Sequence, residues 1–391
     1  MADRWRRRPV LASAAAALAL RGHPAEADEE RYIRIATGSV SGTYYPVAAL
    51  IASLLSRPPG ARLCDEVGGC GVADLILVVE ASKGSVANVE AIAAGETETG
   101  FAQSDVAWGA FSGAGVFDGR APIGDLRALA SLYLETTHLV VTKDSGITGV
   151  PELRGKRVSL DVEGSGTLVD TLLVLDAFGL SQADVQAVHV TPAKALDLMA
   201  AGQLDAMFFI AGYPAAIVTE AAQSLGASLA PITGEAVGRL LREHRFLSVA
   251  DIPGDTYPGV EAGVPTVGVA ALWVVAASLD EELVYQITQA LWHPETLKSL
   301  AAGHPKGAEF SLANALRGVA IPLHPGAARF YREQHGDGRG LAGTVGPEQR
   351  HGAAASDPEA QVRDSGHLAI ALAQSCDLVR RQAHSAMPCS R

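Results

Sequence analysis

A loop rich in glycine and hydroxyl side chains, Gly38 to Pro46, separates a strand-like run from a helix-like run. The run 32–37 before it has an alternating pattern and contains β-branched residues, which is typical of a strand. After it, apolar residues from Val47 to Leu55 recur at the spacing of one helix face. Such a loop presents free backbone N–H groups at a helix N-terminus, where the dipole favours a carboxylate or a phosphate. Taken alone, this loop is either an anion-binding site or a capped helix start.

Four further helix starts have the same character. Ser85 and Ser104 are candidate N-caps, a Gly-Ser-Gly-Thr stretch at 164–167 opens another helix, and Gly212 precedes Pro214 at a favourable first helical position. In an open α/β sheet, the loops that leave the carboxyl ends of parallel strands gather along one edge, where ligands bind. Each loop alone fits ordinary capping, but five together predict a cleft lined with N–H groups, hydroxyls and a few aromatic rings.

Motifs for nucleotide binding or catalysis are incomplete. The stretch that starts at Gly164 lacks the third glycine of a dinucleotide fingerprint, and residues 149–157 have the wrong spacing for a phosphate-binding loop. Residues 38–42 place no serine at the centre of a nucleophile elbow. The eleven histidines show no metal-ligand spacing, and His138, on an expected strand, is interpreted as structural. We therefore expect no catalytic residue, no metal and no cofactor.

Residues 1–27 have the pattern of a cleaved export signal. A basic segment, Arg4 to Arg8, precedes an apolar run at 10–20 that is too short to span a bilayer with ease, and Ala25 and Ala27 fit cleavage before Asp28. The alternative, an amphipathic membrane helix, lacks a polar face, and the arginines do not distinguish the general from the twin-arginine export route. The sequence predicts a soluble periplasmic protein.

Removing the five arginines and two acids of this segment from the 31 basic and 43 acidic residues changes the net charge from −12 to −15. A chain this acidic is expected to bind nucleic acid poorly, because it would be repelled by the phosphates. Cys64 and Cys70 lie close together, and in an oxidising compartment this spacing predicts a small disulfide loop. Half of a zinc site is the alternative, although no second Cys or His pair has suitable spacing.

Strand-like and helix-like runs alternate along most of the chain, which predicts an α/β fold with largely parallel sheets in two similar lobes. The expected strands are 32–37, 75–81, 99–102, 127–132, 138–143, 157–161, 185–190, 205–210, 227–232 and 266–275. The expected helices are 44–56, 85–94, 104–112, 166–178, 193–201, 214–224, 234–244, 280–292 and 295–302. Residues 333–391 lack an apolar period until a short amphipathic piece at 368–379, so we expect a flexible C-terminal extension.

Motifs in a fixed order resemble the periplasmic solute-binding receptors of the TAXI type, which serve tripartite ATP-independent periplasmic (TRAP) transporters. The matching segments are 36–46, 84–89, 101–105, 132–135, 144–147, 164–167, 201–206, 257–259, 265–268 and 321–327. This resemblance implies a type II periplasmic-binding-protein-like α/β fold, with two lobes, a hinge and a ligand cleft between the lobes. Two departures stand out, Leu134 in place of a frequent proline and the long extension after Glu333.

The resemblance further implies lobe I at 28–132 plus 250–332 and lobe II at 133–249, with crossings near 131–137 and 245–255. Ligand-binding positions carried over by motif, or placed beside them, are Thr43, Tyr44, Ser85, Gln103, Ser104, Asp105, Glu135, Ser165, Gly166, Thr167, Phe209 and Pro214. The implied partners are a small carboxylate-bearing molecule, such as glutamate, glutamine or an organic acid, and a TRAP membrane permease. A monomer is expected.

Within this hypothesis, a ligand carboxylate lies against Ser165 to Thr167 or against Gly42 to Tyr44. Glu135 or Asp105 would receive an ammonium group, and the rings of Tyr44 and Phe209 would stack on the aliphatic part. Two other functions stay open at this point, an exported enzyme on the same scaffold and a sensory ligand-binding protein.

Overall fold

The computed structural model describes residues 30–61 and 71–336. The predicted export signal, the predicted Cys64–Cys70 disulfide and the chain after Gly336 lie outside these ranges. No helix within the described ranges is long and apolar enough to cross a membrane.

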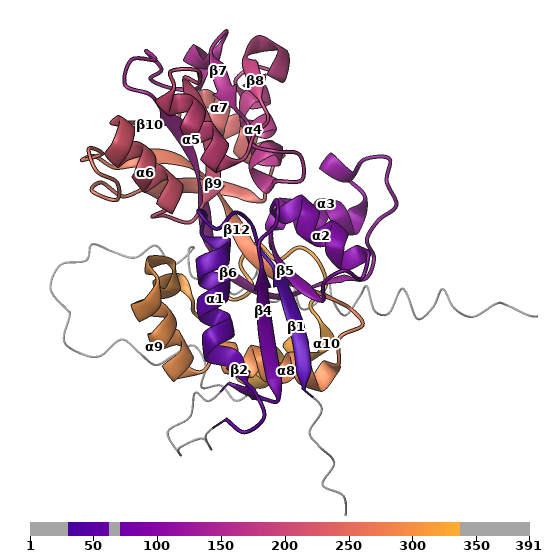
Figure 1. Cartoon of the computed structure of the whole chain (residues 1–391). Coiled ribbons are helices and arrows are strands. Elements are labelled where there is room, and N and C mark those ends of the chain that lie inside the picture. Colours follow the sequence, from indigo (N-terminus) through magenta and orange to yellow (C-terminus); the bar gives the residue numbers. More distant parts are fainter. Residues whose placement is uncertain (1–29, 62–70, 337–391) are drawn as a thin grey trace, which may run out of the picture.

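A ten-stranded sheet runs through both halves of the molecule in the order β4-β1-β5-β12-β6-β9-β7-β8, with β10 paired to β6 and β11 to β12 (Figure 1). Its strands are β1 (Arg31–Ala36), β4 (Leu75–Glu80), β5 (Thr99–Gln103), β6 (Leu126–Val141), β7 (Arg157–Ser159), β8 (Gln186–Val188), β9 (Ala206–Ala211), β10 (Ser228–Ala230), β11 (Leu247–Ile252) and β12 (Val264–Ala276). Neighbours β4, β1 and β5 are parallel, as are β9, β7 and β8, whereas β12 and β6 run antiparallel. Short strands β2 (Ser56–Arg57) and β3 (Val72–Ala73) form a separate pair.

Helices cover the sheet in two groups, which give the two lobes seen in Figure 1. Lobe I carries α1 (Tyr44–Leu55), α2 (Ser85–Ala93), α3 (Ser104–Ser112), α8 (Glu281–Leu291), α9 (Pro294–Gly303) and α10 (Pro325–Gly336). Lobe II carries α4 (Gly166–Ala177), α5 (Pro192–Ala200), α6 (Ala216–Leu225) and α7 (Glu235–Glu243). Single 3₁₀ turns are η1 (Gly115–Phe117), η2 (Val150–Leu153), η3 (Gln182–Asp184) and η4 (Pro305–Glu309). The mixed α/β class expected from the sequence is confirmed.

Two long strands carry the chain between the lobes. Residues of β6 up to Tyr133 belong to the lobe I core, and Leu139 belongs to a lobe II core. In β12 the change falls between Val269 and Ala270, later in the chain than the crossing we placed near 245–255. The segment 247–252 instead forms β11, which pairs with β12. The exact division into lobes therefore remains a prediction.

The sequence led us to expect two strands, at 127–132 and 138–143, where the structure has only β6. The polar run from Glu135 to His138 resembled an interruption, yet these side chains are buried and bonded within the sheet. His138 Nδ1 lies 3.0 Å from the Thr136 carbonyl, and the Thr137 carbonyl accepts a 2.7 Å hydrogen bond from Thr266. Because these buried polar groups have hydrogen-bond partners, β6 continues as one strand from lobe I into lobe II.

The end of the described chain differs from expectation. Helix α10 continues to Gly336, so residues 333–336, which we assigned to a flexible extension, are helical. Glu333 accepts a 2.7 Å hydrogen bond from the Tyr285 hydroxyl of α8, and Arg329 lies 3.7 Å above the Tyr285 ring. Packing of α10 on α8 therefore extends the helix beyond its apolar residues.

Candidate ligand site

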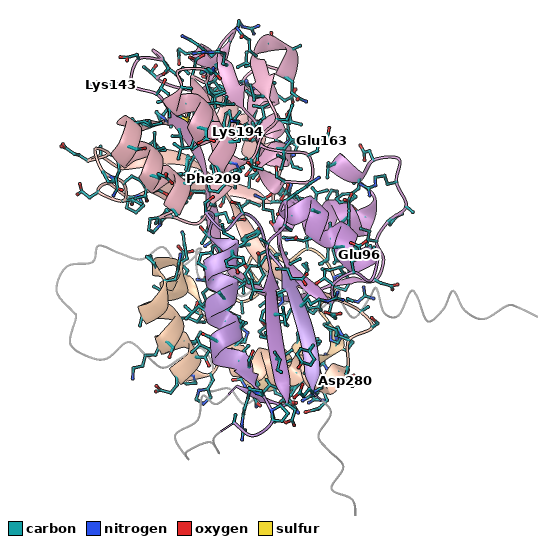
Figure 2. The ribbon with its side chains drawn as sticks, viewed as in Figure 1. Glu96, Lys143, Glu163, Lys194, Phe209 and Asp280 are labelled. Carbon is teal, nitrogen blue, oxygen red and sulfur yellow. The ribbon has the colours of Figure 1, made fainter. Side chains whose placement is uncertain are left out.

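A cavity of about 210 Å³ lies between the lobes. Lobe I contributes the loop before α1, residues 82–85, Gln103 and Glu135. Lobe II faces these groups with residues 161–162 and 165–167 and with parts of the chain around Thr191 and Phe209. Figure 2 shows Phe209 at the boundary of the lobes, far from Lys143 at one end and Asp280 at the other.

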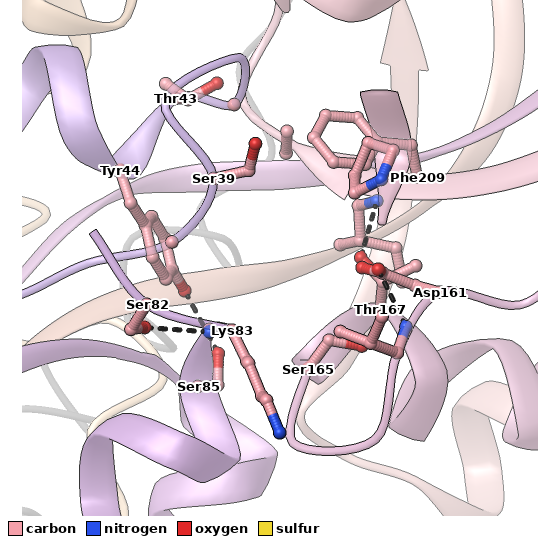
Figure 3. Close-up of a pocket in the computed structure, with 18 of the residues that line it drawn as sticks. Ser39, Thr43, Tyr44, Ser82, Lys83, Ser85, Asp161, Ser165, Thr167 and Phe209 are labelled. Carbon is pink, nitrogen blue, oxygen red and sulfur yellow. Dashed lines mark hydrogen bonds between the residues drawn. The ribbon is translucent and has the colours of Figure 1, made fainter. Parts of the chain in front are cut away.

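Most of the predicted ligand-binding residues meet in this cavity (Figure 3). They are Thr43, Tyr44, Ser85, Gln103, Glu135, Ser165, Gly166, Thr167 and Phe209. The loops converge because each follows the carboxyl end of a sheet strand, as the strand–loop–helix pattern of the sequence predicted. Whether these side chains contact a ligand remains a prediction.

Three predicted residues do not line the cavity. Ser104 is buried at the start of α3, beneath the lining, and Asp105 contacts Asp170 instead. Pro214 does not occupy a first helical position, because α6 begins at Ala216.

The start of α4 is capped by its own chain. Ser165 Oγ accepts a 3.1 Å hydrogen bond from the Leu168 N–H, as expected of an N-cap. Thr167 Oγ1 accepts a 3.2 Å hydrogen bond from the Ile210 N–H, which ties the helix start to β9. Both hydroxyls therefore have structural partners as well as access to the cavity.

The start of α2 is different, because its N-cap is Gly84 at φ 119° and no side chain caps it. A Cβ on Gly84 would come within 3.5 Å of the Ser165 Cα. The Ala87 N–H of α2 donates a 3.0 Å hydrogen bond to the Gly164 carbonyl of lobe II. The positive φ and the close approach of lobe II both favour glycine here.

Glu135 and Tyr44 form a buried pair at the lobe I side of the cavity. The Tyr44 hydroxyl donates a 2.7 Å hydrogen bond to Glu135 Oε2, and Glu135 is 2% exposed. Burial raises the pKa of Glu135 to about 8, although the Tyr44 hydrogen bond opposes this. At neutral pH Glu135 is therefore a neutral acid, able to donate one hydrogen bond and to accept others.

Asp161 also lines the cavity, and our sequence analysis missed it. It adopts φ 70°, and its Oδ1 accepts a 2.8 Å hydrogen bond from the Val162 N–H. Burial raises the pKa of Asp161 to about 6, while the Val162 N–H and the hydroxyls of Ser165 and Thr167 hold it down. Asp161 is thus ionised at neutral pH. A signal was available, since Asp161 is an acid at the end of the strand expected at 157–161.

Gln103 and Gly166 lie close together across the lobe boundary. A Cβ on Gly166 would overlap Gln103 Oε1 and lie 2.8 Å from Ser85 Oγ, so only glycine fits in this conformation. Gln103 is 2% exposed, and its Oε1 has no hydrogen-bond partner among the described residues. A buried acceptor without a donor is costly, and this one is packed against Gly166 at the lobe boundary.

Beneath the cavity, Asp105 of α3 meets Asp170 of α4 across the lobe boundary. Both Asp170 oxygens and Asp105 Oδ1 are buried and find no donor among the described residues. Burial raises the pKa of both groups, that of Asp170 well above its usual range, with the neighbouring Asp105 as a further cause. Burial therefore favours the protonated form of these carboxyls, and two ionised carboxylates so close together would repel each other.

Further contacts hold the lobes together at another edge of the cavity. Thr43 Oγ1 donates a 2.6 Å hydrogen bond to the Gly212 carbonyl. Lys306 of η4 lies 3.5 Å above the Tyr213 ring, while its Nζ forms a 2.6 Å ion pair with Glu309. With the Asp105–Asp170 contact, these interactions describe a closed arrangement of the two lobes.

The chain shares weak similarity with solved solute-binding proteins. The periplasmic aliphatic sulphonate binding protein SsuA from Escherichia coli is 15% identical, with 77% of this chain and 78% of that chain covered and a TM-score of 0.39. The alkanesulfonate-binding protein SsuA from Xanthomonas axonopodis pv. citri, bound to MOPS, is 19% identical, with 79% and 92% covered and a TM-score of 0.40. These values are too low to transfer a ligand.

A family model gives the stronger match. The model of the NMT1-like family aligns with residues 35–335, which is well over half of the chain. The matched segment contains all of the lobe I and lobe II loops that line the cavity. The chain therefore belongs to the NMT1-like family.

Proposed function

We propose that this protein is a periplasmic solute-binding subunit of the TAXI type, which captures a small carboxylate-bearing solute and delivers it to a TRAP membrane permease. The observation that carries this proposal is the small cavity between the two lobes, lined by serines, threonines and glycines at the starts of several helices. A cavity of about 210 Å³ is smaller than the pockets that take drug-sized ligands, and suits a compact solute. The NMT1-like family and the export pattern at residues 1–27 support the same function.

The solute carboxylate fits best at the lobe I side, near the starts of α1 and α2. Gly84 leaves the start of α2 without a side-chain cap, and Lys83 adds a cationic side chain beside it. At the start of α4, by contrast, ionised Asp161 lies close to Ser165 and Thr167 and would repel a second carboxylate. Of the two carboxylate positions that the sequence predicted, we therefore favour Gly42 to Tyr44, together with the start of α2.

A binding role agrees with the chemistry of the lining better than an enzymatic one. Several serines and threonines line the cavity, yet no histidine among the described residues does so. His138 is fully buried, and burial lowers its pKa to about 4. Its Nε2 lies 2.9 Å from the Tyr257 hydroxyl, away from the lining serines. The described lining therefore holds no serine–histidine pair of the kind that activates a nucleophile.

Two measurements test this proposal. Mass spectrometry of denatured protein would identify a co-purified solute, and thermal unfolding would be followed with amino acids, dicarboxylates and 2-oxo acids. At a hundredfold excess over Kd, a bound solute stabilises the folded protein by about 2.7 kcal/mol, so at least one compound should raise the unfolding temperature. A null result with all of them, in protein freed of endogenous solute, would contradict the proposal.

Lys83→Gln provides a variant that leaves the buried lining intact, because Lys83 is exposed at the cavity. We expect a loss of affinity of about tenfold or less for a carboxylate, since the ion pair is partly screened by water. Lys143→Gln, on the distant surface of lobe II, is the matched control and should bind as the parent protein does.

A further inference from the structure

We propose that Asp105 and Asp170 form a proton-linked latch, in which one proton shared between the two carboxyl groups holds the lobes in the closed arrangement. Loss of that proton favours separation of the lobes. Asp105 and Asp170 lie outside the lining of the cavity, so the latch acts from beneath the solute site and does not depend on the identity of the solute.

The packing of two helix starts brings these carboxyl groups together. A Cβ on Gly166 of lobe II would overlap Gln103 Oε1 of lobe I, which shows how closely the two segments approach. Asp105 follows Gln103 by two residues, and Asp170 lies about one helical turn after Gly166. The first turn of α3 therefore packs on the beginning of α4 and places Asp105 against Asp170, which is 1% exposed.

This contact lacks a hydrogen-bond donor of its own. Asp105 Oδ1 and both oxygens of Asp170 are buried and have no partner among the described residues. Glu135 of β6 is a further acid near Asp170. His244, which follows α7 on lobe II, lies near Asp105 but leaves Oδ1 without a partner. Two ionised carboxylates would repel each other here, whereas a proton on one of them supplies the O–H donor of a hydrogen bond between them.

Charged groups on the neighbouring elements have other partners. Glu90 of α2 pairs with Arg120, and Arg239 of α7 donates to a backbone carbonyl at the C-terminal end of α4. Arg127 of β6 donates to a carbonyl of the preceding turn. The other charged side chains of α7 are exposed to water: Glu235, Arg242 and Glu243. A proton is therefore the simplest species that can balance the charge of the two carboxyls.

A shared proton makes closure depend on pH. In separated lobes each carboxyl would be hydrated and titrate near the ordinary aspartate pKa of about 3.9. In the closed contact, burial raises the pKa of both carboxyls, and Asp105 raises that of Asp170 further. Closure at neutral pH therefore takes up a proton, which passes back to water on opening. Between the open and closed pKa values, the ratio of closed to open protein should fall by up to about tenfold per pH unit.

Trp108 is a natural reporter of this contact. It lies about one helical turn after Asp105 on α3, and its ring packs on Phe246 of lobe II with 5.2 Å between the ring centroids. Trp108 is 37% exposed in the closed arrangement, so separation of the lobes would hydrate the ring further and shift its emission to longer wavelength. Trp273 and Trp292 are buried in the lobe I core and contribute a constant background.

Asp170→Asn is the informative substitution, because an asparagine amide donates to Asp105 without taking a proton from solution. Asp105→Asn places the amide on the less buried partner and serves as a second variant if Asp170→Asn does not fold. Asp176→Asn, at an exposed position of the same helix α4, is the matched control. Glu135→Gln tests the other buried acid nearby. Circular dichroism at both ends of the pH range checks that each variant is folded.

The experiment follows Trp108 emission, and the radius of gyration from small-angle scattering, between pH 5 and 8 in protein freed of solute. For the parent protein and Asp176→Asn we expect a red shift and a larger radius as pH rises, with Trp108→Phe as the spectral background. Asp170→Asn, or Asp105→Asn in its place, should stay compact throughout. Glu135→Gln should keep the parent response.

Three results would overturn the latch: an unchanged spectrum and radius in the parent protein, a pH response that persists in the asparagine variant of the pair, or one that disappears in Glu135→Gln. Closure that follows added Na⁺ or Ca²⁺ at fixed pH, instead of pH itself, would replace the shared proton with a bound cation. None of these results bears on solute capture, which the co-purification and thermal unfolding measurements above test separately.

Discussion

The two helix starts that face each other across the cavity belong to different chemical environments. On lobe I, α2 begins at Gly84 without a side-chain cap and beside exposed Lys83. On lobe II, α4 begins with the Ser165 cap in place and with Asp161 close by. A helix N-terminus attracts an anion only if the chain has not already placed one there. Similar glycine–serine sequences at 84–85 and 164–165 therefore present opposite charge preferences to a solute.

The acids of the two walls differ as well. Glu135 on lobe I has Tyr44 as its hydrogen-bond donor, and burial raises its pKa to about 8. Asp161 on lobe II is held near pKa 6, because a backbone N–H and two hydroxyls stabilise its charge. The number of donors around a buried carboxyl thus decides which acid is ionised at neutral pH.

The largest expected effect is on the pH dependence of stability. A carboxyl with a raised folded-state pKa holds its proton longer in the folded protein, so folding stability falls as pH rises between the unfolded and folded values. For Glu135 this window runs from about 4.5 to about 8, and for Asp161 from about 3.8 to about 6. The slope is at most about 1.4 kcal/mol per pH unit for each group.

Glu135→Gln and Asp161→Asn separate the two walls in this experiment. Between pH 6 and 8 we expect Glu135→Gln to reduce the loss of stability, measured by urea unfolding, whereas Asp161→Asn should leave it nearly unchanged. Asp105 and Asp170 add a slope of the same sign to every variant. Equal effects of both substitutions above pH 6 would contradict the assignment of one neutral and one ionised wall.

Gly166→Ala tests how closely the walls must meet. Its methyl group overlaps Gln103 Oε1 in the closed arrangement, and overpacking of this kind costs about 1–3 kcal/mol. We expect affinity for the solute to fall by about 5- to 150-fold, with a larger radius of gyration in small-angle scattering. Gly238→Ala, on α7, where a Cβ would meet only the Arg242 guanidinium at an ordinary 3.5 Å contact, is the control. Unchanged affinity in Gly166→Ala would show that the closed contact is not needed for binding.

The smallest effects distinguish a cap that serves its own lobe from a hydroxyl that joins two lobes. Ser165→Ala removes the α4 cap and should lower unfolding stability by about 1 kcal/mol. Thr43→Val removes the hydrogen bond to Gly212 and should weaken solute affinity by a similar free energy, about 0.5–1.5 kcal/mol, with Thr43→Ser as the rescue. Unfolding curves and calorimetry on the same samples measure both quantities. A loss of affinity without a loss of stability in Ser165→Ala, or the reverse in Thr43→Val, would contradict this distinction.

The sequence predicted the strand–loop–helix units well, because the helical and strand periods are local. Predicted helix ends lie within one or two residues of the observed ends, and the loops of Tyr44, Ser85 and Ser165 meet as expected. Asp161 was missed because it was assigned to the end of the strand at 157–161, where a single acid gives no sign of a binding role. The Asp105–Asp170 contact joins two helices distant in sequence, and no local pattern encodes it.

Strands β6 and β12 cross between the lobes as one hydrogen-bonded antiparallel ribbon, with register shifts at Ala271/Leu272 and Trp273/Val274. A ribbon of this kind has mechanical consequences that a loop linker lacks. Separating the lobes must bend and twist these paired strands, so the resistance to opening grows with the opening angle. The register shifts lie inside lobe I, where β12 also pairs with β5, so the stretch of ribbon that passes between the lobes keeps a continuous register. Opening of the lobes would therefore strain this paired backbone, which a flexible loop linker would not require.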